Sequence, residues 1–283
     1  MKTFKMIGIA LMAVLMCVNF TACSEDDPTG DSSTNHLSNA NKLAKVMQYD
    51  IKNNKKELND IIRFEYDKNG NVVKIHEIYG SDADDIDITE YIWDSNKSIT
   101  SYWENDEYIK YTLTNNQITD ILMHEYVWDW DTETRELDED FYRCTYDKDG
   151  NLIKIWWKDN EEDEEELMNE QTWNNNQLST AKNYDYEHVI TLHYDNKTCK
   201  NFFPLLADYI VNNGFSDDYI FMAQPELLGV RTSKLPSKII DGSCIISFDY
   251  ELNTYGNVTS CMVNKLYSDD NLSYDYFYEF IWE

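Results

Sequence analysis

Hydrophobic and polar residues alternate along much of the chain, and short turn signals interrupt the alternation. The clearest cases are FEYDKNGNVVKI at residues 64–75 and CTYDKDGNLIKI at residues 144–155. In each, Asn-Gly or Asp-Gly stands between two alternating runs, which is the strongest short-range signal for a β-hairpin with a two-residue turn. Both segments are therefore predicted to be antiparallel hairpins.

The predicted turn decides which side chains share a face of the first hairpin. It places Tyr66 opposite Val73 and Phe64 opposite Ile75, because successive residues of a strand point to opposite faces. The apolar face then comprises Ile62, Phe64, Tyr66, Val73 and Ile75. The polar face comprises Arg63, Glu65, Asp67, Val72, Lys74 and His76. We expect the first face to be buried and the second to contact water.

The two hairpins belong to a longer repeat. Gly70 and Gly150 are 80 residues apart (150 − 70), and WDSNKSIT at 93–100 matches WNNNQLST at 173–180 with the same offset. A weaker copy of the hairpin, FDYELNTYGNV, lies at 248–258. Self-similarity of this kind indicates repeated supersecondary units that bury their faces against one another.

The fold class expected from this pattern is all-β, an antiparallel meander of about fourteen strands. Short turns between strands require antiparallel neighbours, and a sheet of this size must curl, close or split. We favour a barrel or a strongly curled sheet, because closure removes exposed edges. The predicted strands include 59–67, 71–79, 86–94, 107–114, 117–128, 136–146, 151–158, 188–195, 244–251, 257–267 and 272–282.

One stretch departs from alternation. Residues 202–229 space their apolar residues as a helix does. Pro204 suits a first helical turn, and Asn213-Gly214 suits a helix end. We predict a short helical insertion of two helices, which plugs the barrel or covers a face of the sheet.

Composition and charge exclude some functions. The chain of 283 residues has 24 Lys and Arg against 53 Asp and Glu, a formal net charge of −29. Nucleic-acid binding is not expected, because phosphate contacts need clustered basic residues. With 42% hydrophobic residues, 21 Tyr, 8 Trp and 11 Phe, the chain has enough apolar surface to build a core.

The N-terminus has the pattern of an export signal. Lys2 and Lys5 precede an apolar run that ends at Thr21-Ala22-Cys23. This run is too short to span a bilayer as a mature helix, and small residues follow it, as in a secretory signal peptide. We predict three parts: a signal peptide over 1–22, a flexible polar tether over 23–41, and a single β domain over 42–283 whose repeat units are 64–140 and 144–220.

Several short motifs resemble those of known families. Thr21-Ala22-Cys23 resembles a bacterial lipobox, which implies that Cys23 is acylated and becomes the new N-terminus. The following Ser24-Glu25-Asp26-Asp27 resembles the tag of Bacteroides-type lipoproteins exported to the outer face of the outer membrane. Together, these resemblances imply an outer-membrane protein that is held by a lipid and faces the cell exterior.

The hairpins carry a further resemblance. Tyr66-Asp67 and Tyr146-Asp147 begin a YD-x-x-G-N pattern similar to the tyrosine-aspartate repeats of large bacterial surface proteins. With the lipobox, the chain looks like a Bacteroides lipoprotein family of unknown function that has a porin-like fold. The resemblance covers most of residues 45–283 and implies a closed antiparallel meander. It supplies no catalytic residues.

Metal and cofactor chemistry has little support in the sequence. The five histidines are scattered, and the four cysteines of the β domain lack the spacing of a zinc site. Cys144 and Cys261 occupy apolar strand positions and are expected in the core, while an exported compartment also allows a Cys244–Cys261 disulfide. The acidic turn at Asp129-Trp-Asp131-Thr-Glu133 lacks the Gly of a helix-loop-helix calcium site. We expect no metal, no cofactor and no catalytic residue.

Aromatic residues are the best candidates for ligand binding. Trp156 should lie beside Lys154 on the wet face of its strand, with Trp157 on the core face. Tyr126, Trp128 and Trp130 should share one face next to an acidic turn. Exposed rings beside polar groups can stack on sugars, whereas packing under another layer is the alternative.

Several function classes remain open at this point. The first is non-enzymatic binding of a glycan, a peptide or another host ligand, which predicts an exposed aromatic patch and no cluster of perturbed carboxylates. The second is a structural or docking subunit of an outer-membrane complex, which predicts a broad apolar patch. A hydrolase would need two carboxylates across a cleft. A membrane-spanning porin-like barrel would need an apolar outer band.

Overall fold

The computed structural model describes most of the second of two compact units, which runs from Leu37 to Glu283. The described residues are 42–80, 86–95, 97–102, 107–129, 134–160, 163–184, 188–200, 202–206, 219–230, 234–268 and 272–283. The predicted signal peptide, Cys23 and the tether lie outside these residues, as do Trp130 and Gly214.

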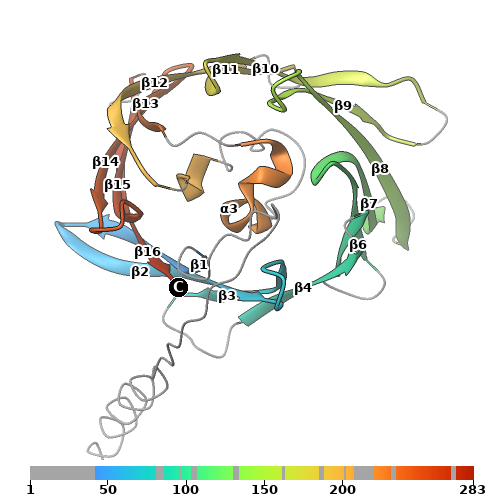
Figure 1. Ribbon diagram of the computed structural model, residues 1–283, viewed down its shortest axis with the longest axis horizontal. Helices are drawn as coiled ribbons and strands as arrows, with labels where there is room; N and C mark the ends of the chain where they lie inside the picture. Colours follow the sequence, from blue (N-terminus) through green and yellow to red (C-terminus); the bar gives the residue numbers. More distant parts are fainter. Residues whose placement is uncertain are drawn as a thin grey trace, which may run out of the picture. The chain divides into compact units, whose positions relative to one another are not determined.

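Sixteen strands in the described residues form one closed antiparallel barrel, in which each strand pairs with the next and β16 pairs with β1 (Figure 1). They are β1 (Leu43–Lys52), β2 (Lys55–Tyr66), β3 (Val72–Tyr79), β4 (Ile86–Asp94), β5 (Ser98–Tyr102), β6 (Tyr108–Thr114), β7 (Gln117–Asp129), β8 (Thr134–Tyr146), β9 (Leu152–Lys158), β10 (Glu166–Asn174), β11 (Gln177–Asn183), β12 (His188–Thr198), β13 (Lys234–Asp241), β14 (Cys244–Leu252), β15 (Val258–Tyr267) and β16 (Leu272–Trp282). The predicted fold class is confirmed, with sixteen strands in place of about fourteen. Every predicted strand range coincides with an observed strand, and β1, β5, β10, β11 and β13 complete the barrel.

The register defines an inner and an outer wall. Tyr91, Ser101 and Ile109 lie opposite one another on β4, β5 and β6, and all three are buried. Paired residues of an antiparallel sheet face the same side, so this row marks the inner wall. Residues one position away along each strand belong to the outer wall.

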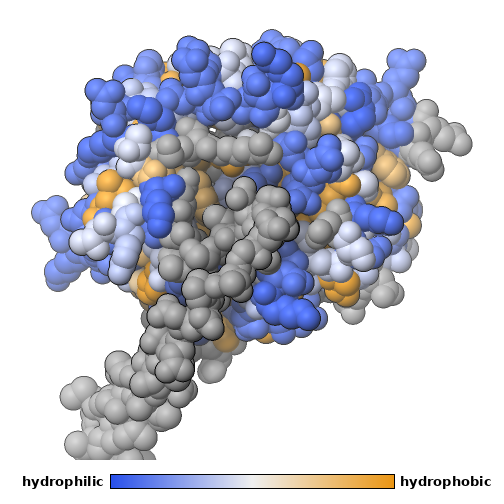
Figure 2. Space-filling view, viewed as in Figure 1, coloured by the Kyte–Doolittle hydropathy of each residue, from blue (hydrophilic) through white to orange (hydrophobic). Residues whose placement is uncertain are grey.

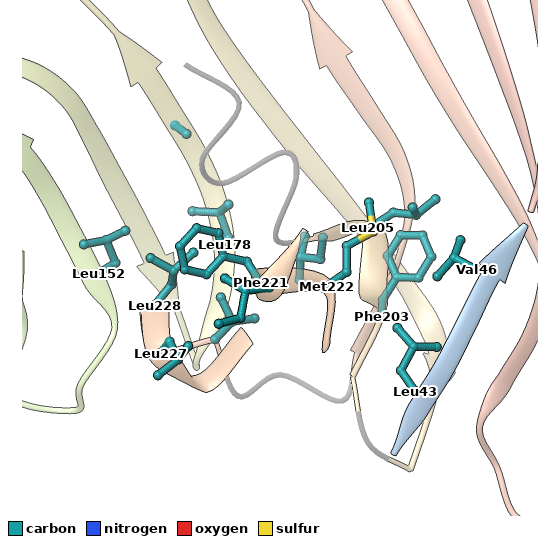
Figure 3. Close-up of a cluster of buried hydrophobic side chains, with 14 of the residues drawn as sticks. Leu43, Val46, Leu152, Leu178, Phe203, Leu205, Phe221, Met222, Leu227 and Leu228 are labelled. Carbon is teal, nitrogen blue, oxygen red and sulfur yellow. The ribbon is translucent and has the colours of Figure 1, made fainter. Parts of the chain in front are cut away.

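The helical insertion, here called the plug (residues 202–206 and 219–230), lies inside the barrel (Figure 1). It contains α3 (Ile220–Ala223) and the 3-10 helix η2 (Pro225–Leu228). Phe221 of the plug meets Tyr111 of β6 edge-to-face at 5.9 Å, and Phe203 meets Tyr250 of β14 at 5.0 Å. Figure 3 shows Phe203 and Phe221 of the plug between Leu152 of β9 on one side and Leu43 of β1 on the other. The predicted helical insertion is confirmed, and it plugs the barrel. Among the described residues, no helix is long and apolar enough to span a membrane.

The tight loops differ from the predicted two-residue turn. Asp67 closes a longer loop: its Oδ1 accepts the backbone N–H groups of Asn69 at 2.8 Å and Asn71 at 2.9 Å. A bulge between Glu65 and Tyr66 then places Val72 opposite Tyr66. Val72 is therefore buried, at 0% exposure, so its predicted place on the polar face and the predicted pairing of Tyr66 with Val73 were wrong. Phe64 does lie opposite Ile75, as expected.

The same loop and its supporting tryptophan occur at three places. Asp147 accepts the N–H groups of Asp149 and Asn151, and Asn253 accepts those of Tyr255 and Asn257. Two strands follow each loop. A Trp on the second of these strands donates its indole N–H to a backbone carbonyl on the first strand, that of its first residue. The pairs are Trp93 with Val72, Trp173 with Leu152 and Trp282 with Val258. Each loop is thus anchored to the neighbouring hairpin.

The four described cysteines are buried, free thiols. Cys144 and Cys261 belong to the hydrophobic core, as predicted, while the Cys244–Cys261 disulfide was a wrong alternative. Burial raises the pKa of Cys144 to about 12, so its thiol stays protonated and unreactive at neutral pH.

We predict that Asp147→Ala destabilises the barrel by about 2 kcal/mol, because it removes charge-assisted bonds to the loop backbone. Although burial alone would raise the pKa of Asp147, hydrogen bonds from Asn151, Asp149 and Gly150 hold that pKa below its usual value. Because the pKa of Asp147 is lower in the folded protein than in the unfolded chain (about 3.9), its carboxylate stabilises the fold fully at pH values above 3.9. This stabilisation is lost as the pH falls through the pKa of the folded protein. Urea unfolding at several pH values measures it. Asp149→Ala, in the same loop, is the control and should change little.

Candidate functional site

The hairpin of β7 and β8 extends beyond its neighbours. Each strand has 13 residues, whereas β6 reaches only His124 of β7 and β9 reaches only Phe141 of β8. In the described part of the chain, the pairs from Glu125–Asp138 to Asp129–Thr134 therefore have no further strand on either side. We call this two-stranded segment the ribbon (residues 125–129 and 134–138).

The ribbon carries an aromatic surface on the side of the outer wall. Tyr126 is 38% exposed, Trp128 is 48% exposed, and Leu137, directly opposite Tyr126, is 50% exposed. We call these three residues the platform. The expected shared face of Tyr126 and Trp128 is confirmed.

An ion pair fixes the platform to the barrel. Glu107 is buried, and its Oε1 accepts a hydrogen bond from Arg135 at 2.5 Å and from the backbone N–H of Tyr126 at 3.2 Å. The guanidinium of Arg135 lies 5.7 Å from the centre of the Tyr126 ring. An isolated two-stranded hairpin is only marginally stable in water, so this anchor gives the rings a fixed orientation.

Trp156 lies elsewhere on the outer wall. It faces outward and Trp157 faces inward, as expected. Its ring is held between the cations of Arg143 at 5.3 Å and Lys154 at 5.7 Å, and its buried indole N–H has no partner among the described residues.

The structure separates this tryptophan from the platform. Trp156 lies opposite Arg143 and Trp128 opposite Arg135, and both arginines belong to β8. Eight residues along a strand correspond to about 27 Å. The candidate aromatic residues therefore form two places on the surface, not one.

Sequence reasoning missed a group of carboxylates on the inner wall. Glu125, Asp138 and Asp140 lie on adjacent positions of β7 and β8, and Asp140 accepts the indole N–H of Trp157 at 2.6 Å. Burial, together with Asp140, Asp138 and Glu107, raises the pKa of Glu125. Burial also raises the pKa of Asp140, which the bond from Trp157 partly offsets. The alternation of acidic residues along β8, Asp138-x-Asp140, was the available signal.

These carboxylates can share protons, but they do not form a metal site. No group of His, Cys, Asp and Glu within the described ranges could hold a metal ion. Carboxyl groups with raised pKa values are the type of residue that serves as a general acid.

No protein-family model matches the chain, and no curated protein sequence matches it either. Among solved structures, the fold is similar to a porin-like protein from Bacteroides uniformis, with a TM-score of 0.62 and 14% identity over 86% of this chain and 98% of that chain. It is also similar to a porin-like protein from Bacteroides vulgatus, with a TM-score of 0.53 and 14% identity over 86% of this chain and 99% of that chain. At this identity the likeness is one of fold, and it agrees with the porin-like fold that the family resemblance implies.

We predict that Glu125→Gln stabilises the protein at pH 7, because it removes one of several like charges held close together. A raised folded pKa means that ionisation weakens the fold as the pH rises through that pKa. The advantage of the variant should therefore disappear as the pH falls toward the ordinary Glu value of about 4.3. Thermal unfolding of both proteins between pH 4 and 8 measures this. An advantage that is equal at every pH would show that charge repulsion is not its cause.

We predict that Arg135→Ala loosens the ribbon without unfolding the barrel, because it removes the cation that binds Glu107. Backbone hydrogen exchange should become at least tenfold faster in residues 125–138, which corresponds to the loss of roughly 1.4 kcal/mol of local stability. Arg143→Ala, on the same strand, is the control and should leave the ribbon protected. Unchanged exchange in the first variant would show that the ribbon does not depend on this ion pair.

Proposed function

We propose that this protein is a lipid-anchored barrel on the cell surface that binds carbohydrate through the platform without catalysing a reaction. The observation that carries the proposal is the pair of exposed rings, Tyr126 and Trp128, on a ribbon that extends past the barrel wall. Rigid rings with exposed faces can stack on sugar rings at low entropic cost, and the polar group of Arg135, directly opposite Trp128, lies close by.

The inner and outer walls support a role in binding more than a role as a pore. The plug and its apolar contacts occupy the lumen. Ion pairs lie on the outer wall, including Lys74–Glu90 at 2.8 Å and Lys154–Glu170 at 3.2 Å. A spanning barrel instead keeps an apolar outer band and a polar interior.

Strand length points in the same direction. β5 has five residues, or about 17 Å, whereas a spanning strand needs roughly 9–11 residues. The end of the barrel seen in Figure 2 is mostly hydrophilic, with hydrophobic residues scattered among the polar ones. These features suit a barrel that stands in water.

The anchor and the location rest on the sequence. Acylation of Cys23 would hold the protein at the outer membrane, and the acidic tag at Ser24-Glu25-Asp26-Asp27 supports export to the outer face. A flexible tether of about 18 residues spans roughly 20–25 Å, enough to hold the folded part away from the lipid.

We predict that Trp128→Ala weakens binding to the recognised glycan roughly tenfold, because stacking on the ring is lost. A glycan array with the purified full chain would identify the ligand, and tryptophan fluorescence would give the affinity of each variant. Tyr255→Ala is the matched control, since Tyr255 is an exposed ring (74%) in a different loop. Trp156→Ala should also bind like the parent.

Different results would favour the alternative functions. A folded protein that binds no glycan would contradict the proposal and favour a docking subunit, for which exposed Ile86, Ile88 and Ile92 on β4 offer an apolar surface. Cleavage of an array glycan, lost in Glu125→Gln, would instead establish a hydrolase that uses the inner-wall carboxylates.

A further inference from the structure

A hollow of about 350 Å³ lies on the outer wall over β6, β7, β8 and β9. One row of its lining crosses all four strands in register, from Lys110 through Leu122 and Phe141 to Lys158. The next row runs from Thr112 through Asp120 to Arg143, and Glu165 closes the side beside Arg143. Its volume lies within the range of small-molecule sites, roughly 300–1,000 Å³.

The hollow has the opposite charge to the rest of the protein. Lys110, Arg143 and Lys158 contribute +3, and Asp120 and Glu165 contribute −2, a net charge of +1. The whole chain carries −29. At physiological salt, charges more than about 8 Å away are largely screened, so a bound group would mainly interact with the local cations.

The cations of the hollow differ in how they are held. Lys110 is exposed and forms no ion pair with a described residue. The ammonium of Lys158 lies 5.3 Å from the centre of the Phe141 ring. Arg143 is bound by Glu165, with its Nε 3.0 Å from both carboxylate oxygens, and both side chains are more than a third exposed. The pair is bidentate, but both groups reach water, so an incoming anion can compete with Glu165 for Arg143.

The remaining lining suits a polyhydroxylated molecule. Carboxylate oxygens of Asp120 and the hydroxyl of Thr112 can accept hydrogen bonds from hydroxyl groups. Phe141 offers an apolar ring surface beside them. A small inorganic anion would use only the cations, whereas a sugar that bears an acidic group can use the cations, the hydrogen-bond acceptors and the ring.

We propose that this outer-wall hollow binds a saccharide that carries a carboxylate or sulfate group. The acidic group lies among Lys110, Lys158 and Arg143, and the hydroxyl groups lie toward Asp120 and Thr112. This site is independent of the platform, from which β8 separates it by several residues.

The test is calorimetric titration of the full chain with short oligogalacturonate, a carboxylated sugar, and with a neutral galactose oligomer of equal length. The parent should bind the acidic oligomer and not the neutral one. Lys110→Gln should weaken binding about fivefold, as expected for the loss of one charge pair near water. Glu165→Gln should strengthen binding by a similar factor, because Arg143 is released.

Further variants distinguish binding in the hollow from binding elsewhere on the surface. Lys238→Gln removes the same charge from the outer wall of β13 and should leave the affinity unchanged. Thr112→Trp fills the hollow and should abolish binding in a protein that still unfolds cooperatively. Trp128→Ala should have no effect, so failure of the platform would not be confused with failure of the hollow.

Three results would overturn the proposal. The first is equal binding of the neutral and acidic oligomers by the parent. The second is an unchanged affinity in both Lys110→Gln and Glu165→Gln. The third is binding of oligoglutamate in the absence of oligogalacturonate binding, which would identify an acidic peptide as the ligand class. A sulfated galactose oligomer, titrated in parallel, distinguishes a sulfate from a carboxylate preference.

Discussion

Phe221 and Phe203 of the plug pack against Tyr111 of β6 and Tyr250 of β14, on opposite sides of the inner wall. The apolar interior of the barrel depends on these contacts. Each buried Phe or Leu of the plug contributes roughly 1.5–3 kcal/mol through the area it removes from water. The plug covers apolar side chains of the inner wall, so the hydrophobic core of the barrel lies inside it. The outer wall carries ion pairs, such as Lys74–Glu90 and Lys154–Glu170.

Most strands could be predicted because the side chains of the inner wall are mostly apolar and those of the outer wall mostly polar, which produces a clear alternation along the sequence. Phe64 and Ile75 face each other as the two-residue period requires. The bulge at Tyr66 could not be foreseen, since it depends on how the Asp67 carboxylate binds the loop backbone. That interaction adds residues to the turn and places Val72, buried, opposite Tyr66.

The strands that escaped prediction have a common physical cause in β10 and β11. Their inner wall carries buried amides, Asn169, Gln171 and Asn183, in place of apolar side chains. The alternation of hydrophobic and polar residues is therefore weak in β10 and β11, although both segments form strands. Asn169 has 0% exposure, and neither its amide nitrogen nor its oxygen has a partner among the described residues. Such a residue is recognisable as interior only once the register with Ile155 is known.

The candidate site shows the same limit. Sequence periodicity correctly places Trp156 on the wet face and Trp128 on one face with Tyr126, but it cannot rank them, because exposure depends on neighbouring strands. Trp156 has β8 and β10 beside it and two cations against its ring, whereas Trp128 lies where β6 and β9 have already ended. A ring with uncovered sides is the better stacking surface. In the proposed function, recognition takes place on the outer surface of the barrel, where the platform and the hollow lie.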